Sequence, residues 1–224
     1  MIEAPLRALE SAVVVDDWNV DAVRTWLWEH HRRKCYLCEC PISRSEFEVD
    51  HRVPQRVSEQ LVHCSVNLFP ACRSCNGRRG SHPKQGGLLC PGFDSDLEAR
   101  LEQRIQRIDA TEVRACFSAR DPEDLDAINT AAELDRIHSP ESGTTPTAKA
   151  RAMDLLDAIV DHYAAKIAPL ERKVLRARRR GQPDRVAERD LGRALARSEP
   201  FTMLLHSLVA TELGDLLVQA LASE

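Results

Sequence analysis

Two pairs of cysteines have the spacing of a metal site, Cys35-x-x-Cys38 and Cys72-x-x-Cys75. A tight turn within each pair can present two thiolates to one ion, and two such turns complete a tetrahedral zinc site with no open position. The gap between the pairs exceeds the ~15–20 residues of simple zinc ribbons, so another element is inserted there. We therefore predict one structural zinc ion on these four thiolates.

The other cysteines leave one alternative open. Cys40 or His63 can replace one of the four ligands, whereas Cys64, Cys90 and Cys116 lack paired spacing and favour packing in the core. No secretory leader is evident, and we expect a cytoplasmic protein in a reducing compartment. Eight cysteines are not expected to form disulfides there, which favours metal ligation.

The stretch "EVDHRVPQ", residues 48–55, carries ionisable groups between the two cysteine pairs. A neutral histidine at His51 can accept a proton at pH 7, and carboxylates at Glu48 and Asp50 suit Mg²⁺ or Mn²⁺. Neighbouring residues on a strand point to opposite faces, so Asp50 and His51 share a cation only if the strand ends or bends. Pro54 makes such an end plausible; otherwise Glu48 and Asp50 are the paired ligands.

Short elements must position these groups. We predict a hairpin in which residues 39–42 pair with residues 47–51, followed by a loop and a basic segment that begins a helix after the second cysteine pair. Zinc would clamp this segment against the hairpin.

Three stretches in this order, "CYLC", "EVDHRVPQ" and "NLFPACRSCNGRRG", resemble the motif of HNH nucleases, whose ββα-metal fold grips one divalent cation between a hairpin and a helix. The middle stretch is also similar to the HNH domain of RNA-guided CRISPR nucleases, which lack the cysteine pairs. The resemblance covers about residues 35–82, a quarter of the chain. It implies metal-dependent hydrolysis of phosphodiester bonds in DNA.

The resemblance gives each matching residue a role. His51 takes the position of the general base, and Asn67 that of the asparagine that orients it. Asp50 and Asn76 take the positions of the two cation ligands, and Asn76 stands where many members have histidine. From the strand argument, Glu48 remains a further candidate ligand for the catalytic Mg²⁺ or Mn²⁺.

Basic residues around this motif can hold a phosphate backbone without reading bases. Residues 30–85 contain ten Lys or Arg and five Asp or Glu, a basic module in a chain of net charge −4. A histidine at position 82 fits a further contact or a solvated loop equally well. The predicted phosphate contacts are Arg52, Arg56, Arg73, Arg78, Arg79, which stands where a lysine is common, and Lys84.

The rest of the chain predicts a mainly α protein with helical N- and C-terminal extensions around a small α+β, zinc-containing ββα-metal core. An amphipathic helix is expected over residues 17–34, a charged helical pattern over 94–137, and helices from about 147, with a kink or end at Pro169, and over 200–221. The expected domains are 1–34, 35–93, 94–146 and 147–224.

This layout also resembles the nuclease subunits of Septu-type or retron-associated bacterial anti-phage systems, which work beside an ATPase subunit. The resemblance implies DNA and an ATPase subunit as partners, and no membrane span is expected. The arginine run in "LERKVLRARRR" fits a solvated helical face as well as phosphate binding. The alternatives are a zinc-stabilised binding module for nucleic acid or protein without catalysis, and an RNase or toxin on the same scaffold.

Overall fold

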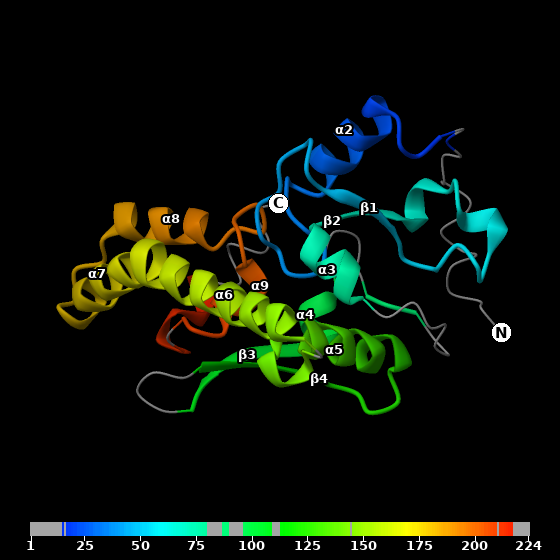
Figure 1. The fold of residues 1–224 in the computed structure, drawn as a ribbon. Helices are drawn as coiled ribbons and strands as arrows, with labels where there is room; N and C mark the ends of the chain where they lie inside the picture. The colour runs from blue at the N-terminus through cyan, green and yellow to red at the C-terminus, as the bar shows by residue number, and fades with distance from the viewer. Residues whose placement is uncertain are drawn as a thin grey trace. The chain divides into compact units, whose positions relative to one another are not determined.

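The computed structural model describes residues 15, 17–79, 87–89, 96–108, 113–143, 145–209 and 211–216. The chain divides into two compact units, residues 1–102 with 117–137 and residues 103–116 with 138–224. Helices dominate, with two small two-stranded sheets, as Figure 1 shows. The predicted fold class is therefore confirmed, while the predicted domain limits stay a prediction.

Helix α2, Asp21–His30, opens the described part of the first unit and is shorter than the predicted helix. Its buried Leu27 packs with Phe47 and Leu68 in a small core. Arg32 and Arg33 take positive φ angles of 57° and 61°, which turn the chain out of the helix toward the first cysteine pair.

Strand β1, Glu48–His51, pairs antiparallel with β2, Leu68–Ala71, and helix α3, Arg73–Arg78, follows directly. The predicted pairing of residues 39–42 with 47–51 is therefore wrong. Glu39 has a φ angle of 56°, which a regular strand excludes, and its segment makes only a single bridge between Lys34 and Pro41. The fully buried β2 is the partner that covers β1.

Further along the chain, α4, Leu97–Arg100, leads into β3, Leu101–Arg107, which pairs with β4, Val113–Ala119. Residues 103–116 of this hairpin belong to the second unit. The helical pattern predicted for residues 94–137 is wrong over this hairpin and holds for α5, Leu125–His138. Residues of β4 such as Val113 and Phe117 favour strands, but the helical pattern of the charged residues dominated the prediction.

The second unit is built around α6, Pro146–His162, whose start matches the predicted one and is capped by Thr145. A π-helical turn, Tyr163–Ile167, then leads into α7, Ala168–Arg179, so α6 ends before the predicted kink or end at Pro169, which lies in the first turn of α7. Helices α8, Arg185–Ala194, and α9, Thr202–His206, complete the unit. The predicted helix over 200–221 is thus much shorter where the chain is described, and residues 217–221 lie outside the described part.

Short 3₁₀ turns join these elements at Glu59–Leu61, Ser65–Asn67, Pro140–Ser142 and Thr211–Leu213. In the described ranges, every helix is too short or too polar to cross a bilayer.

Candidate metal centre and active site

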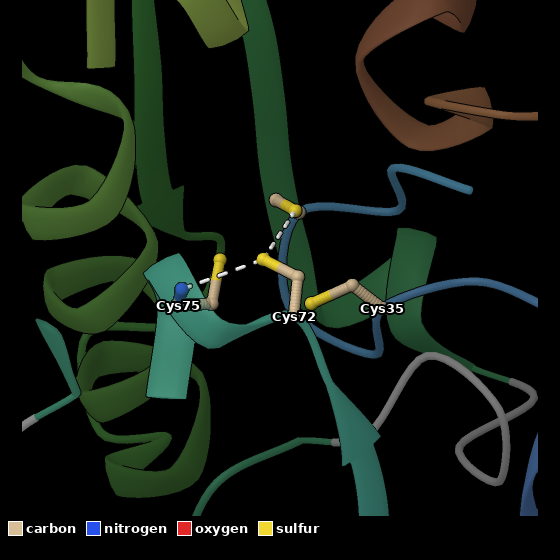
Figure 2. A group of neighbouring side chains, drawn as sticks. Cys35, Cys72 and Cys75 are labelled. Atoms are coloured by element: carbon tan, nitrogen blue, oxygen red, sulfur yellow. Dashed lines mark hydrogen bonds between the residues drawn. The ribbon is translucent and has the colours of Figure 1, made fainter. Parts of the chain in front are cut away.

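The four predicted zinc ligands come together. The sulfur atoms of Cys35, Cys38, Cys72 and Cys75 all lie within 4.8 Å of one another. The Sγ atoms of Cys38 and Cys72 are 3.9 Å apart, close to the ~3.8 Å edge of a sulfur tetrahedron with zinc–sulfur bonds of ~2.3 Å. Figure 2 shows Cys35 meeting Cys72 and Cys75 from a distant segment of the chain. The cluster can therefore hold a structural metal such as zinc.

Local backbone geometry explains why each pair turns toward the ion site. In the first turn, the Glu39 amide donates to the Cys35 carbonyl and the Cys35 amide donates to the Cys40 carbonyl, each at 2.9 Å. In the second, Cys72 caps α3 and its sulfur accepts from the Cys75 amide at 3.4 Å. Neither Cys40 nor His63 belongs to the four-sulfur group, so the alternative ligand sets are not required.

Carboxylates and an amide gather where β1 faces α3. The Asn76 amide Nδ2 donates to Glu48 Oε2 at 2.7 Å, and Arg73 Nε lies 3.7 Å from Glu48 Oε1. Two residues along the strand, Asp50 accepts a hydrogen bond of 2.5 Å from the Tyr36 hydroxyl. Glu48 and Asp50 thus share one strand face, as the alternation of side chains requires.

The Asp50 carboxylate is already paired with Arg79. Its guanidinium forms an ion pair with Asp50, and the two side chains are only 7% and 11% exposed. The same group donates to the carbonyl oxygens of His51, at 2.8 Å, and of Arg52. Arg79 therefore ties the end of β1 to the residues after α3, and in this arrangement it offers little to a phosphate.

His51 ends β1 and points away from the carboxylates. Its buried ring lies edge-on to Trp18, with ring centres 5.3 Å apart. Nε2 lies 3.0 Å from the Val62 carbonyl oxygen, and because a carbonyl only accepts, Nε2 carries the proton. Nδ1 is then the acceptor, and the Gln55 amide donates to it at 3.2 Å. Burial lowers the pKa of His51, so the ring is neutral at pH 7.

Gln55 was missed by sequence reasoning, although it closes the same "EVDHRVPQ" stretch. A spacing of four residues after a strand does not predict a contact with His51, because the contact depends on how the loop after β1 turns back. That turn is what brings the Gln55 amide to Nδ1.

Asn67 acts on the loop that follows His51. Its Oδ1 accepts from the Val53 amide at 2.6 Å, and its Nδ2 donates to the carbonyls of Val53 and Leu61 at 3.1 and 3.0 Å. Leu61 precedes Val62, whose carbonyl holds the His51 ring. Asn67 therefore affects His51 only through the backbone next to Val62 and does not contact the ring. The predicted role, in which Asn67 orients the histidine, implies a more direct effect.

The predicted phosphate contacts have different surroundings. Arg73 is exposed, with 87% of its side chain accessible, and Arg56 is also exposed. Arg52 is half-buried, and Arg78 donates to the carbonyls of Arg136 and Ile137 at the end of α5. Lys84, like the histidine at position 82, lies outside the described residues.

The candidate catalytic groups flank one strand end from two sides. Glu48, Asp50 and Asn76 lie on the α3 side, and His51 lies on the other. Within the described part of the chain, Glu48, Asp50 and His51 do not come within 4.8 Å of one another as the cysteine sulfurs do. The structure therefore assembles the four-sulfur site and keeps the catalytic candidates as two neighbouring groups.

Comparison with known proteins gives one informative relative. A segment of 81 residues is 32% identical to Septu protein PtuB of Bacillus thuringiensis. The match covers 35% of this chain, and the chain spans 32% of the relative's length. No family model matches the chain, and no solved structure matches it.

Proposed function

We propose that the chain is a metal-dependent HNH-type endonuclease that hydrolyses phosphodiester bonds in DNA. The observation that carries the proposal is the β1–β2–α3 unit, in which Glu48, Asp50 and Asn76 cluster on one side and a neutral His51 lies on the other. The four-sulfur group fastens the start of α3 to the segment before β1. A binding module without catalysis would need only the sulfurs.

His51 is the proposed general base. With the proton on Nε2 held by the Val62 carbonyl, Nδ1 keeps its lone pair for a water molecule. Gln55 donates to that lone pair in this structure, so a reacting water takes its place or is oriented by its amide. The lowered pKa keeps the imidazole unprotonated, which general-base catalysis at pH 7 requires.

Oxygen donors on the α3 side fit a hard cation. Glu48 and Asp50 supply carboxylates and Asn76 supplies an amide oxygen, the ligand types that Mg²⁺ and Mn²⁺ favour. Such a cation, when bound, stabilises negative charge on the phosphoryl oxygens and assists the departing oxygen. Arg79 holds Asp50 through an ion pair in the present arrangement and keeps that carboxylate oriented toward α3.

We further propose a role in bacterial anti-phage defence, in the cytoplasm, beside an ATPase partner. The named relative, a Septu protein matched at 32% identity over 81 residues, supports this context. The exposed Arg73 and Arg56 supply phosphate contacts that carry no sequence preference.

Incubation with supercoiled plasmid in Mg²⁺ or Mn²⁺ tests the nuclease. We expect nicked or linear product, and a loss of about 10²–10⁴-fold in rate for His51→Ala, the range for removing a general base. Purified partner and ATP are added in a second arm, so that a requirement for either is detected. Equal cleavage by wild type and His51→Ala would remove the catalytic assignment. A structured single-stranded RNA in a parallel reaction distinguishes the RNase alternative.

A further inference from the structure

A second basic region lies far from the cysteine pairs in the sequence. Residues 172–197 contain ten Lys or Arg and three Asp or Glu, an excess of seven positive charges. The chain as a whole has a net charge of −4, and residues 30–85 carry an excess of five positive charges. All residues outside these two regions therefore sum to −16. The positive charge of this acidic chain is therefore concentrated in two regions.

Helix α7 arranges the unpaired part of this charge in one row. The row consists of four exposed arginines, Arg172, Arg176 and Arg179 in α7 and Arg180 at its C-cap. At 100° per residue, their positions fall within an arc of about 100° around the helix axis. The opposite face is fixed, because Val174 is fully buried and Glu171 accepts from the Tyr163 hydroxyl. The row cannot turn inward without unpacking α7.

Five other cations of this region form ion pairs with acids. Arg178 is bound by Glu188 and Asp215, with distances of 3.0 and 2.8 Å. The remaining pairs use acids within residues 172–197: Lys173 with Asp184, Arg185 with Glu188, and Arg189 and Arg193 with Asp190. For the four arginines of the α7 row, no salt bridge is found among the residues that the structure describes.

Helix stability does not account for the row. Cations in the last turn of a helix interact favourably with its dipole, which explains one or two of these residues. Arg172 to Arg176 and Arg176 to Arg180, however, are like charges four residues apart, which repel. An exposed, repulsive row of planar guanidinium groups matches a regular line of phosphates, which bind arginine in bidentate fashion.

We propose that the α7 row, Arg172, Arg176, Arg179 and Arg180, is a binding surface for the phosphate backbone of duplex DNA. From Arg172 to Arg180 the helix rises by about 12 Å, and B-DNA carries one charge per ~1.7 Å of its axis, so several phosphates lie within reach. The inference rests on the proposed function for the identity of the ligand. It assigns DNA binding to the second unit, outside the candidate active site.

Binding of a fluorescent 30-base-pair DNA duplex of arbitrary sequence tests the proposal. The full chain carries His51→Ala and no divalent cation is added, so cleavage does not interfere. The test variant is Arg172→Gln/Arg176→Gln/Arg179→Gln, and the affinity is measured between about 50 and 200 mM NaCl. Each lost phosphate contact lowers the slope of log affinity against log salt by about 0.9. We therefore expect a slope smaller by 2–3, and at least about tenfold weaker binding near 100 mM salt.

A matched control removes the same charge from α8. The variant Arg185→Gln/Arg189→Gln/Arg193→Gln loses three arginines that are already paired with acids, so its salt slope should change by less than one. A third variant, Arg172→Lys/Arg176→Lys/Arg179→Lys, retains the charge and should retain the salt slope, with a smaller loss of affinity because lysine does not bind phosphate in bidentate fashion. Thermal melting of all three confirms that the second unit is folded.

The outcomes separate this inference from the nuclease proposal. Unchanged affinity and slope in the α7 variant would overturn it and favour an acidic protein as the occupant of the row. An equal decrease of the salt slope in the α8 control, or in the lysine variant, would also overturn it. Plasmid cleavage is measured separately with the active chain. If the chain binds DNA through the row but does not cleave it, only the nuclease proposal is wrong. If the chain cleaves DNA but its binding does not depend on the row, only the present inference is wrong.

Discussion

The cysteine cluster and the end of β1 lie in the same unit but are organised in opposite ways. At the cluster, four identical donors from two distant turns converge within 4.8 Å. At the end of β1, different donors lie on two strand faces, and one of them, Asp50, is already paired with Arg79. The first arrangement suits one cation shared by four thiolates; in the second, the carboxylate already has a cationic partner.

This difference indicates separate roles for the two places. A closed four-sulfur site leaves no position for substrate, so a metal held there would support the fold. The β1 end keeps its carboxylates hydrogen-bonded and its imidazole neutral. In the proposed function, the first site would support the fold and the second would carry the chemistry.

The largest effect is expected from the cluster. Cys72→Ser removes a zinc ligand and the cap of α3 together. Binding of a structural zinc contributes about 10–16 kcal/mol in small zinc domains, more than the ~5–15 kcal/mol stability of a typical domain. We expect loss of stoichiometric zinc by elemental analysis and loss of the cooperative thermal transition of the first unit.

Cys116→Ser is the matched control for this prediction. Cys116 is half-buried on β4, lies outside the four-sulfur group and makes only a weak contact from its thiol to Gln106 at 3.6 Å. The control should bind one zinc ion per chain with unchanged affinity. One tightly bound zinc in Cys72→Ser would contradict the assignment of the cluster.

An intermediate effect is expected at the Asp50–Arg79 pair. Arg79→Gln leaves a buried carboxylate without its cation and should lower the free energy of unfolding by about 3–5 kcal/mol. If Asp50 is a cation ligand, millimolar Mn²⁺ restores part of that stability, because the metal replaces the guanidinium. The measurement is denaturant unfolding with and without Mn²⁺.

The double variant Asp50→Asn/Arg79→Gln sharpens the comparison. It removes both charges, so it should be more stable than Arg79→Gln alone and should not respond to Mn²⁺. An equal response of the double variant would place the cation elsewhere and count against Asp50 as a ligand.

The cluster could be predicted from sequence because spacing alone determines it. Cys35-x-x-Cys38 and Cys72-x-x-Cys75 form turns whatever surrounds them, and the distance between the pairs does not matter once the chain folds back. The partner of β1 could not be predicted in this way, because Glu39 takes a positive φ angle that breaks the expected strand. The fully buried "LFPA" of β2 was the better signal, as a continuous apolar run.

At the β1 end the strand argument left two arrangements open. The structure has Glu48 and Asp50 on one face and His51 on the other, which is the alternative rather than the shared site expected from a strand end at Pro54. Residue type alone did not distinguish Arg79, which is buried against Asp50, from Arg73, which is exposed. That distinction depends on where α3 ends, and the last residue of a helix is difficult to predict from the neighbouring sequence alone.

The smallest effect concerns the protonation of His51. Because burial lowers its pKa below 6.5, the native state favours the neutral ring, and the unfolded state takes up the proton first as the pH falls. Stability contributed by His51 is therefore present above pH 6.5 and decreases below it, by at most about 1.4 kcal/mol per pH unit. His51→Gln should remove this part of the pH dependence of unfolding between pH 6.5 and 5.5.

The same lowered pKa determines the rate profile of an active chain. If His51 is the general base, kcat/KM for plasmid cleavage should be constant from pH 8 to 6.5 and fall only below that, with a midpoint under 6.5. The α3 side provides no histidine among its described contacts with Glu48 and Asp50, so an acid limb in this range points to the other face of β1. A midpoint at or above 6.5 would mean that the reacting base is solvated, unlike the buried His51 ring held between Val62 and Gln55. The pH profile therefore tests whether His51, on one face of the strand end, is the reacting base. The Mn²⁺ response of Arg79→Gln tests whether Asp50, on the other face, binds the cation.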